Sequence, residues 1–525
     1  MSLVSAKGNT LALAGLIVAV SMTTIDQTIV ALSAPTIQAD LGITHDAMQW
    51  AVNAYLIATA AFFLLGGRLS DIVGHKRMAL LGIATFGLTS LLCGLAPEGA
   101  AAAPWLITAR ALQGIAGAVM FPAAIGLVVQ GFPRAARGKA MAAFFAITGA
   151  MTALGPIAGG LLSVWTWRAI FWVNVPLAVI AFVIVAISAA RSQGRRERVD
   201  LRGGLVIAAG LALVVFGLQQ AGSWGWQSVA VVGSIVVGLA LVGLFVLIES
   251  RTAQPLVRLA AFRDRGFVIA VLSTLFASIG FVATFFFLSV YGQVSLQLSA
   301  LSTGLLFLKF FIGFVVASRV GAARFDRLGA RSVLVIGGLI GAAGYAWLAV
   351  ALTRIPDHPD RFFNPQTWPI MLAGAGIGFM ISAASTDAVN RAIGASYGEV
   401  TAISQTMRNF GGALGLAVFS TVVTNVLGDK LTASFTALGA TGADARSALD
   451  TISGHGDGAA LAALPATVRH QFENAVQVGY AESVAWAFAG MAVAMIVVAL
   501  LGALYPKGQV SAVVTSESAD AAARV

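Results

Sequence analysis

The sequence predicts an all-α integral membrane protein with about fourteen transmembrane helices. Of its 525 residues, 58% are hydrophobic and only 10% are charged, and the mean hydropathy is +0.89. A soluble domain carries roughly 25% charged residues, because they cover its surface in water. Here the apolar residues instead form repeated runs of about twenty, which is the helix length that crosses a hydrocarbon core of about 30 Å.

Taken in order along the chain, these runs place each helix between short connections. Two segments fall outside the pattern. Residues 428–481 form a long, less apolar stretch on the external side, and residues 506–525 resemble a disordered cytoplasmic tail. The predicted spans are 11–33, 48–69, 77–96, 104–126, 139–161, 169–190, 203–220, 228–249, 266–290, 301–320, 332–352, 369–389, 401–427 and 482–505.

Positively charged side chains set the orientation of these spans. Every other short loop is rich in Lys and Arg, whereas the intervening loops hold almost none. Because basic loops stay on the cytoplasmic side, we expect both termini there, in a multi-pass protein of the plasma membrane. The net charge of +10 is then explained by loops that set the membrane orientation and contact anionic lipids, and no nucleic acid is expected as a partner. The basic loops contain Lys76 and Arg77; Arg134, Arg137 and Lys139; Arg191, Arg195, Arg196, Arg198 and Arg202; Arg251, Arg258, Arg263 and Arg265; and Arg324, Arg327 and Arg331.

Residues that would indicate a metal, a cofactor or an enzyme are sparse. The single cysteine, Cys93, lies in an apolar run, which excludes an internal disulfide and a cysteine-ligated cluster. His455 and His470 occur in the external stretch without companion ligands, so we interpret them as solvated surface residues. No group of nucleophile, base and ligand stands out, and we expect neither enzymatic activity nor a cofactor.

A charged pair is predicted inside the first and fourth spans. Charges at membrane depth cost several kcal/mol and usually carry function. Asp26 lies about 8 Å below the outer membrane edge and Arg110 about 9 Å below it, so the two can pair. One interpretation is a structural salt bridge. We favour a protonatable carboxylate whose charge state depends on burial and on Arg110, since apolar packing replaces a purely structural pair at little loss.

Lys309 is a second intramembrane charge, with about eight apolar residues on each side. It is expected to pair with a carboxylate across a central cavity, of which Asp26 is the nearest by composition, or to contact substrate. The alternative is a lysine that stretches to one interface.

Two glycine-containing segments are candidate moving parts. In "GAMTALGPIAGG", glycine and proline inside a span permit close helix approach and bending. In "GGRLSDIVGHKR", Asp71 is expected to cap a neighbouring helix, and Lys76 and Arg77 to pair with acids, forming a cytoplasmic latch; a plain topogenic loop is the alternative. A faint repeat, "GAARFDRLGAR", aligns with this loop, matching Gly66 with Gly321 and Gly74 with Gly329, and such duplication is typical of secondary transporters. The candidate residues are Gly149, Gly155, Pro156, Gly159 and Gly160 in the first segment, and Gly67, Arg68, Asp71, Gly74, Lys76, Arg77 and the repeat's Asp326 in the second.

Six motifs resemble the major facilitator superfamily, and within it the fourteen-helix drug:proton antiporters. They are "IDQTIVALSAP", "WAVNAYLI", "GGRLSDIVGHKR", "RALQGIAGAVMFP", "GPIAGG" and "WRAIFWVNVP". In this family the fourth-helix arginine is implicated in proton coupling, a role that the resemblance assigns to Arg110 together with Asp26. Two departures are notable. Lys309 stands near a position where proline is common, and Ala323 stands where the first loop copy has Arg68.

The resemblance implies two pseudo-symmetric six-helix halves, 1–195 and 264–505, with an inserted helix pair in 196–263. It also implies a central cavity, to which we assign Lys309, Asn53, Tyr55 and Gln113. The expected function is proton-coupled export of an amphipathic or hydrophobic small molecule, such as a drug or antibiotic, by a monomer in the lipid bilayer. Export of an endogenous metabolite or lipid is the main alternative, and a proton symporter or a non-transporting sensor are further ones.

Overall fold

The computed structural model describes residues 3–151, 154–190, 192, 194, 200–252, 254–359, 361–391, 397–437 and 466–506. Within these ranges the chain consists of helices and their connections, without strands, and no group of His, Cys, Asp and Glu is placed to hold a metal. The predicted tail and His455 lie outside the described residues, as does the side chain of His470.

The described helices match the predicted spans in number. Twelve are long and apolar enough to cross a membrane, and two shorter apolar helices, Lys139–Gly149 and Thr367–Met380, coincide with the predicted spans 139–161 and 369–389. The all-helical membrane fold is therefore confirmed. The helices are α1 Leu3–Leu41, α2 His45–Val73, α3 His75–Gly94, α4 Ala102–Gly131, α5 Arg134–Met151, α6 Leu154–Trp165, α7 Ala169–Trp172, α8 Asn174–Ser188, α9 Leu201–Trp224, α10 Val229–Glu249, α11 Arg265–Val294, α12 Ala300–Leu352, α13 Thr367–Arg391, α14 Tyr397–Ala437 and α17 Ala466–Ala503, with short 3₁₀ helices at Gly99–Ala101 and Leu259–Arg263.

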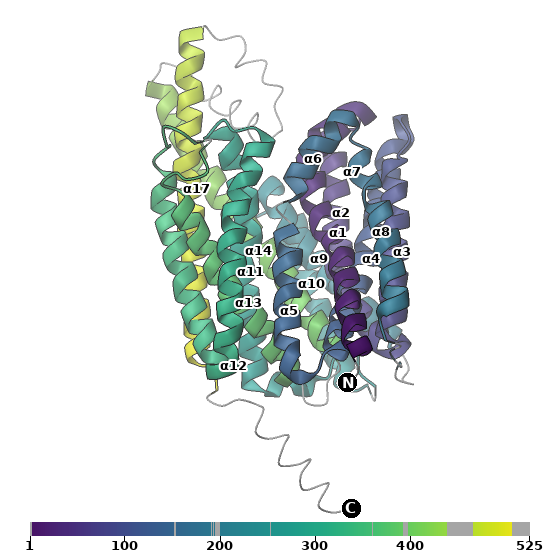
Figure 1. The fold of residues 1–525 in the computed structure, drawn as a ribbon. Helices are drawn as coiled ribbons and strands as arrows, with labels where there is room; N and C mark the ends of the chain where they lie inside the picture. The colour runs from purple at the N-terminus through teal and green to yellow at the C-terminus, as the bar shows by residue number, and fades with distance from the viewer. Residues whose placement is uncertain are drawn as a thin grey trace, which may run out of the picture.

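Two helices on one side of the molecule are much longer than a membrane crossing requires. At about 1.5 Å per residue, α14 spans about 60 Å and α17 somewhat less, against a hydrocarbon core of about 30 Å. Their surplus turns project beyond the other helices at the top of Figure 1. Lys430 of α14 and Glu482 of α17 form an ion pair. Parts of the predicted external stretch 428–481 are thus helical continuations of α14 and α17.

The helices gather into two groups with a pair between them. Figure 1 shows α1–α4 and α6–α8 on one side and α11–α14 and α17 on the other. The helix α9 contacts both groups: Gln220 accepts a hydrogen bond from Asn53 of α2 at 3.3 Å, and Trp226, just after α9, donates one to Thr421 of α14 at 2.7 Å. The predicted division at 195 and 263 stays a prediction.

The outward faces of the peripheral helices are apolar, as a lipid environment requires. Leucine, valine, isoleucine and tryptophan side chains are widely exposed, among them Ile187 on α8 and Val229 on α10. In water such a surface would be an association site. A multi-pass membrane protein accounts for it without a partner protein.

Glycines set the spacing between α12 and α13. A methyl group at Gly313 of α12 would overlap the backbone carbonyl of Met371, and one at Gly378 of α13 would overlap the carbonyl of Phe314. Because neither backbone can retreat without moving a whole helix, these glycines hold the two helices in direct backbone contact.

We expect Gly313→Ala and Gly378→Ala to lower the thermal stability of the detergent-solubilised protein, because overpacking costs about 1–3 kcal/mol and sometimes more. The matched control is Gly243→Ala on α10, where a methyl group meets nothing within 4 Å. Thermal unfolding followed by tryptophan fluorescence measures the difference. Equal melting temperatures for all three variants would contradict this account of the packing.

Candidate functional site

Five buried polar side chains from four helices meet inside the first helix group. They are Asp26 of α1, Ser90 of α3, Arg110 and Gln113 of α4, and Asn174 at the start of α8, and none is more than 1% exposed. We call these five residues the buried polar cluster. A group of this kind is expensive at membrane depth unless its members satisfy one another.

The cluster is organised around the carboxylate of Asp26. Arg110 Nη1 forms an ion pair with Asp26 Oδ2 and donates to Gln113 Oε1 at 2.7 Å. Gln113 Nε2 donates to Asp26 Oδ1 at 3.0 Å and to Ser90 Oγ at 3.2 Å. Asn174 Nδ2 donates to Asp26 Oδ1 at 3.4 Å and to Ser90 Oγ at 2.9 Å. Both carboxylate oxygens are therefore hydrogen-bonded and shielded from solvent.

Local sequence explains why α4 presents this chemistry. Arg110 and Gln113 are three residues apart, so their side chains lie on the same helix face. Gly114 follows at once, and a methyl group there would overlap the backbone carbonyl of Tyr55 on α2. That close approach places the Tyr55 ring 4.3 Å from the guanidinium carbon of Arg110, a cation–π contact.

Sequence reasoning found part of this cluster. The structure pairs Asp26 with Arg110, as their equal depth predicted, and it brings Gln113 and Tyr55 to the pair. Asn53 lies apart, bonded to Gln220 of α9. Ser90 and Asn174 were missed. Asn174 stands inside the quoted "WVNVP", where a polar residue between apolar ones was the available signal.

Lys309 does not join the cluster. Its side chain is 1% exposed, and its ammonium nitrogen lies 5.4 Å from the ring centre of Phe362, in the connection between α12 and α13. Asp26 is instead occupied by Arg110, and no carboxylate within the described residues lies at ion-pair distance from Lys309. Because the side chain is 1% exposed, it does not reach solvent at the membrane interface, and the alternative of a lysine stretching there stays a prediction. Its cavity role stays a prediction.

The loop between α2 and α3 is built around Gly74. This glycine has φ +105°, which strongly favours a residue without a side chain, and the aligned Gly329 inside α12 has φ +74°. Gly66 and its counterpart Gly321 also share a role, since a methyl group at either would overlap a backbone carbonyl of a neighbouring helix. The faint repeat is therefore visible in the backbone. The second copy lies between two membrane spans, Ser302–Phe325 and Arg327–Leu352, as the sequence predicted, and the backbone kinks at Gly329.

The structure gives Lys76 of this loop partners other than the acid that was predicted. Lys76 Nζ donates to the carbonyls of Ala186 and Ala189, both at 2.8 Å, and so caps the C-terminal end of α8 rather than pairing with an acid. Asp71 lies 3.4 Å from the His75 imidazole. Arg77 is exposed. Arg68 is buried, Gly67 is buried beside it, and the side chain of Asp326 lies outside what the structure describes.

The predicted antiporter segment contacts helices of both groups, α12 in one and α1 in the other. A methyl group at Gly149 of α5 would be 3.4 Å from Phe311 of α12, and one at Gly155 of α6 would overlap the Thr28 hydroxyl of α1. Gly159 is buried, whereas the surroundings of Pro156 and Gly160 lie outside the described part. Close approach is thus observed at two of the predicted positions, and a role in transport stays a prediction.

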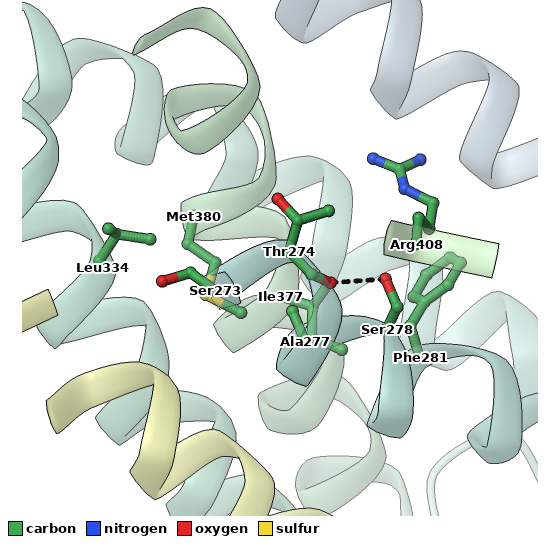
Figure 2. Close-up of a pocket in the computed structure, with 9 residues that line it drawn as sticks. All are labelled: Ser273, Thr274, Ala277, Ser278, Phe281, Leu334, Ile377, Met380 and Arg408. Carbon is green, nitrogen blue, oxygen red and sulfur yellow. Dashed lines mark hydrogen bonds between the residues drawn. The ribbon is translucent and has the colours of Figure 1, made fainter. Parts of the chain in front are cut away.

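A separate pocket lies in the second helix group and was not predicted. Figure 2 shows the residues that line it. Arg408 of α14 stands at its edge and begins the segment "RNFGGALG". An arginine eleven residues into a membrane helix was the signal available. The pocket is lined by Ser273, Thr274, Ala277, Ser278, Phe281, Leu334, Ile377, Met380 and Arg408.

Comparison with known proteins identifies the fold's relatives. The sequence profile described as Major Facilitator Superfamily matches residues 16–206 and 201–416, which is most of the chain. The chain belongs to the major facilitator superfamily. The resemblance predicted from the six motifs is confirmed, and this superfamily member is a multi-pass membrane transporter.

Its relatives are efflux and resistance proteins by name. It is 36% identical to the puromycin resistance protein pur8 of Streptomyces alboniger, over 76% of this chain and 79% of the relative. It is 31% identical to the tetracenomycin C resistance and export protein of Streptomyces glaucescens, over 78% and 75%, and 34% identical to the cephamycin export protein CmcT of Amycolatopsis lactamdurans, over 76% and 81%. Among solved structures, the proton:xylose symporter XylE superposes with a TM-score of 0.60 at 13% identity, covering 96% of this chain and 97% of that one, which shows a shared fold.

We expect Arg110→Gln to lower the melting temperature of the purified transporter strongly, because it leaves the Asp26 carboxylate buried without its cation, at about 3–5 kcal/mol. In the double variant Asp26→Asn/Arg110→Gln no charge remains, so part of that loss should be recovered. A thermal double-mutant cycle measures the coupling. Additive effects of the two substitutions would show that the ion pair contributes nothing.

Lys76 and Arg77 give a matched test of the loop. Lys76→Met removes two charge-assisted bonds to the end of α8, each worth about 1.5–3 kcal/mol at most, whereas Arg77→Met removes only an exposed side chain. We expect Lys76→Met alone to increase proteolytic cleavage or hydrogen exchange at the end of α8. Equal protection in both variants would contradict the capping role.

Proposed function

We propose that this transporter exports amphipathic small molecules from the cytoplasm in exchange for protons, by alternating access of a central cavity to the two membrane sides. The observation that carries the proposal is the shielded ion pair between Asp26 and Arg110. A carboxylate that is buried yet charge-compensated is a group whose protonation changes the energy of its surroundings, which a coupling site requires.

The relatives support the direction of transport. Two of them carry export in their names and others carry resistance to an antibiotic or to several drugs, including multidrug resistance protein 3 of Bacillus subtilis, 28% identical over 81% of each chain. Proton symporters share the fold at 13% identity, which carries no argument about direction. Export is thus the direction that the more similar proteins favour.

The proposed cycle uses the cluster as a proton site. A proton arriving from the external side neutralises Asp26, which weakens its attraction to Arg110 and leaves that cation with Gln113 and the Tyr55 and Phe171 rings. The first helix group then repacks, and substrate leaves outward. Release of the proton inward restores the pair. Each charge that crosses gains about 2.3 kcal/mol per 100 mV of membrane potential.

The basic loops would face the cytoplasm in this cycle, as the positive-inside rule predicts, with both termini on that side and the protein in the plasma membrane. The beginning of α1 and the end of α17 lie at the same end of the molecule (Figure 1), as this orientation requires. The Lys76 cap on α8 then lies at the cytoplasmic end and would break when the halves separate there.

We expect Asp26→Asn to abolish concentrative export while substrate exchange without a gradient continues, because the amide keeps the side chain's size but takes up no proton. Proteoliposomes with an imposed pH gradient measure the first activity and counterflow measures the second, with protein content normalised. Undiminished gradient-driven export by Asp26→Asn would refute the coupling role. Proton and substrate movement in the same direction would favour the symport alternative.

A further inference from the structure

The pocket beside Arg408 combines an apolar wall with several hydroxyl groups. Phe281, Leu334, Ile377 and Met380 supply the apolar side, and Figure 2 shows Ser273, Thr274 and Ser278 on one helix, α11, opposite Arg408 of α14. Pockets that bind small molecules have this character: mostly apolar lining with a few polar groups that fix orientation.

Arg408 lies where the two helix groups meet. Its guanidinium carbon is 5.2 Å from the ring centre of Phe145 on α5, a helix of the N-terminal half. Both residues stand about 16 Å along their helices from the end where the basic loops lie, which places the contact near the membrane middle. The cation is therefore held between a pocket wall of one half and an aromatic ring of the other.

The charge of Arg408 is uncompensated within the described part of the chain. No carboxylate there lies at ion-pair distance, and the buried Nε atom has no hydrogen-bond acceptor. Arg110, by contrast, has a full ion pair with Asp26. A cation–π contact offsets only part of the cost of burying a guanidinium at membrane depth.

One hydroxyl group of the pocket also lacks a hydrogen-bond partner. Thr274 and Ser278 donate to backbone carbonyls of their own helix, Ala270 at 2.9 Å and Thr274 at 2.7 Å. Ser273 is 1% exposed, and its Oγ has no partner among the described residues. A buried hydroxyl without a partner and a half-buried cation without a described acid thus line one pocket.

We propose that this pocket binds the acidic group of the exported molecule, so that the substrates are amphipathic anions carrying a carboxylate, phosphate or comparable group. Arg408 binds the anionic oxygens, and Phe281, Ile377 and Met380 contact the apolar body. The inference rests on the proposed export function and adds the substrate class to it. It also separates the two charges of the cycle: the proton on Asp26 in one half, the substrate anion on Arg408 in the other.

The test uses three probes that share one ring system: 1-naphthylacetate, its methyl ester and 2-(1-naphthyl)ethylamine. Binding to the full-length purified protein is measured by thermal stabilisation and by quenching of tryptophan fluorescence. We expect the wild type to bind the acid at least tenfold more tightly than the ester or the amine. Arg408→Gln should abolish this preference by weakening acid binding at least tenfold while changing ester binding less than twofold, and Arg408→Lys should retain part of it.

Two controls separate this proposal from its foundation. Arg324→Gln, at an exposed position on α12, should leave all three affinities unchanged. Asp26→Asn should bind the acid normally although it no longer exports against a gradient. A wild-type protein that does not export against a gradient would refute the proposed function but not the pocket. The pocket assignment is overturned if Arg408→Gln weakens acid and ester equally, or if the wild type binds the ester, the amine or none of the three in preference to the acid.

Discussion

The structure depends on one constraint: a charge inside the hydrocarbon region must be compensated by the protein itself, because no water is there to do it. The ion pair between Asp26 and Arg110 meets this constraint with two amides and a serine around it. These bonds tie α1, α3, α4 and α8 together at one depth. The pair is therefore the centre of a polar network that joins four helices, and the proton site that we propose lies at that centre.

Elsewhere the helices pack closely because glycine stands at their contacts, and not because of further polar bonds. Without a hydrophobic driving force between helices in lipid, association relies on close backbone contact. Gly313 and Gly378 provide that contact between α12 and α13, and Gly114 provides it between α2 and α4. Such interfaces are stiff within a half. Between the halves, aromatic side chains such as Phe145 and Phe311 meet an arginine and a glycine, and those contacts separate without breaking a backbone fit.

The sequence predicted the features that depend on the geometry of a single helix. Hydropathy predicted the spans, and rise per residue predicted that Asp26 and Arg110 share a depth, since both depend only on helix geometry. Features that depend on which way a long side chain extends were missed. Lys309 extends toward Phe362 and Lys76 reaches helix-end carbonyls, because a flexible lysine takes whichever acceptors the fold brings near.

The two halves of the repeat now differ in a way that bears on coupling. The backbone conformation is repeated, since Gly74 and Gly329 both have a positive φ. The buried charges are not repeated: the first half holds the ion pair of Asp26 with Arg110, and the second holds Arg408 without an acid in the described part of the chain. If both halves were neutral, protonation in one would be felt in the other only through packing. An uncompensated cation at the contact between α14 and α5 adds an electrostatic link, because any change in the position of α5 alters the surroundings of Arg408. A repeated backbone with different charges in its two halves is consistent with the exchange of protons for anions that we propose.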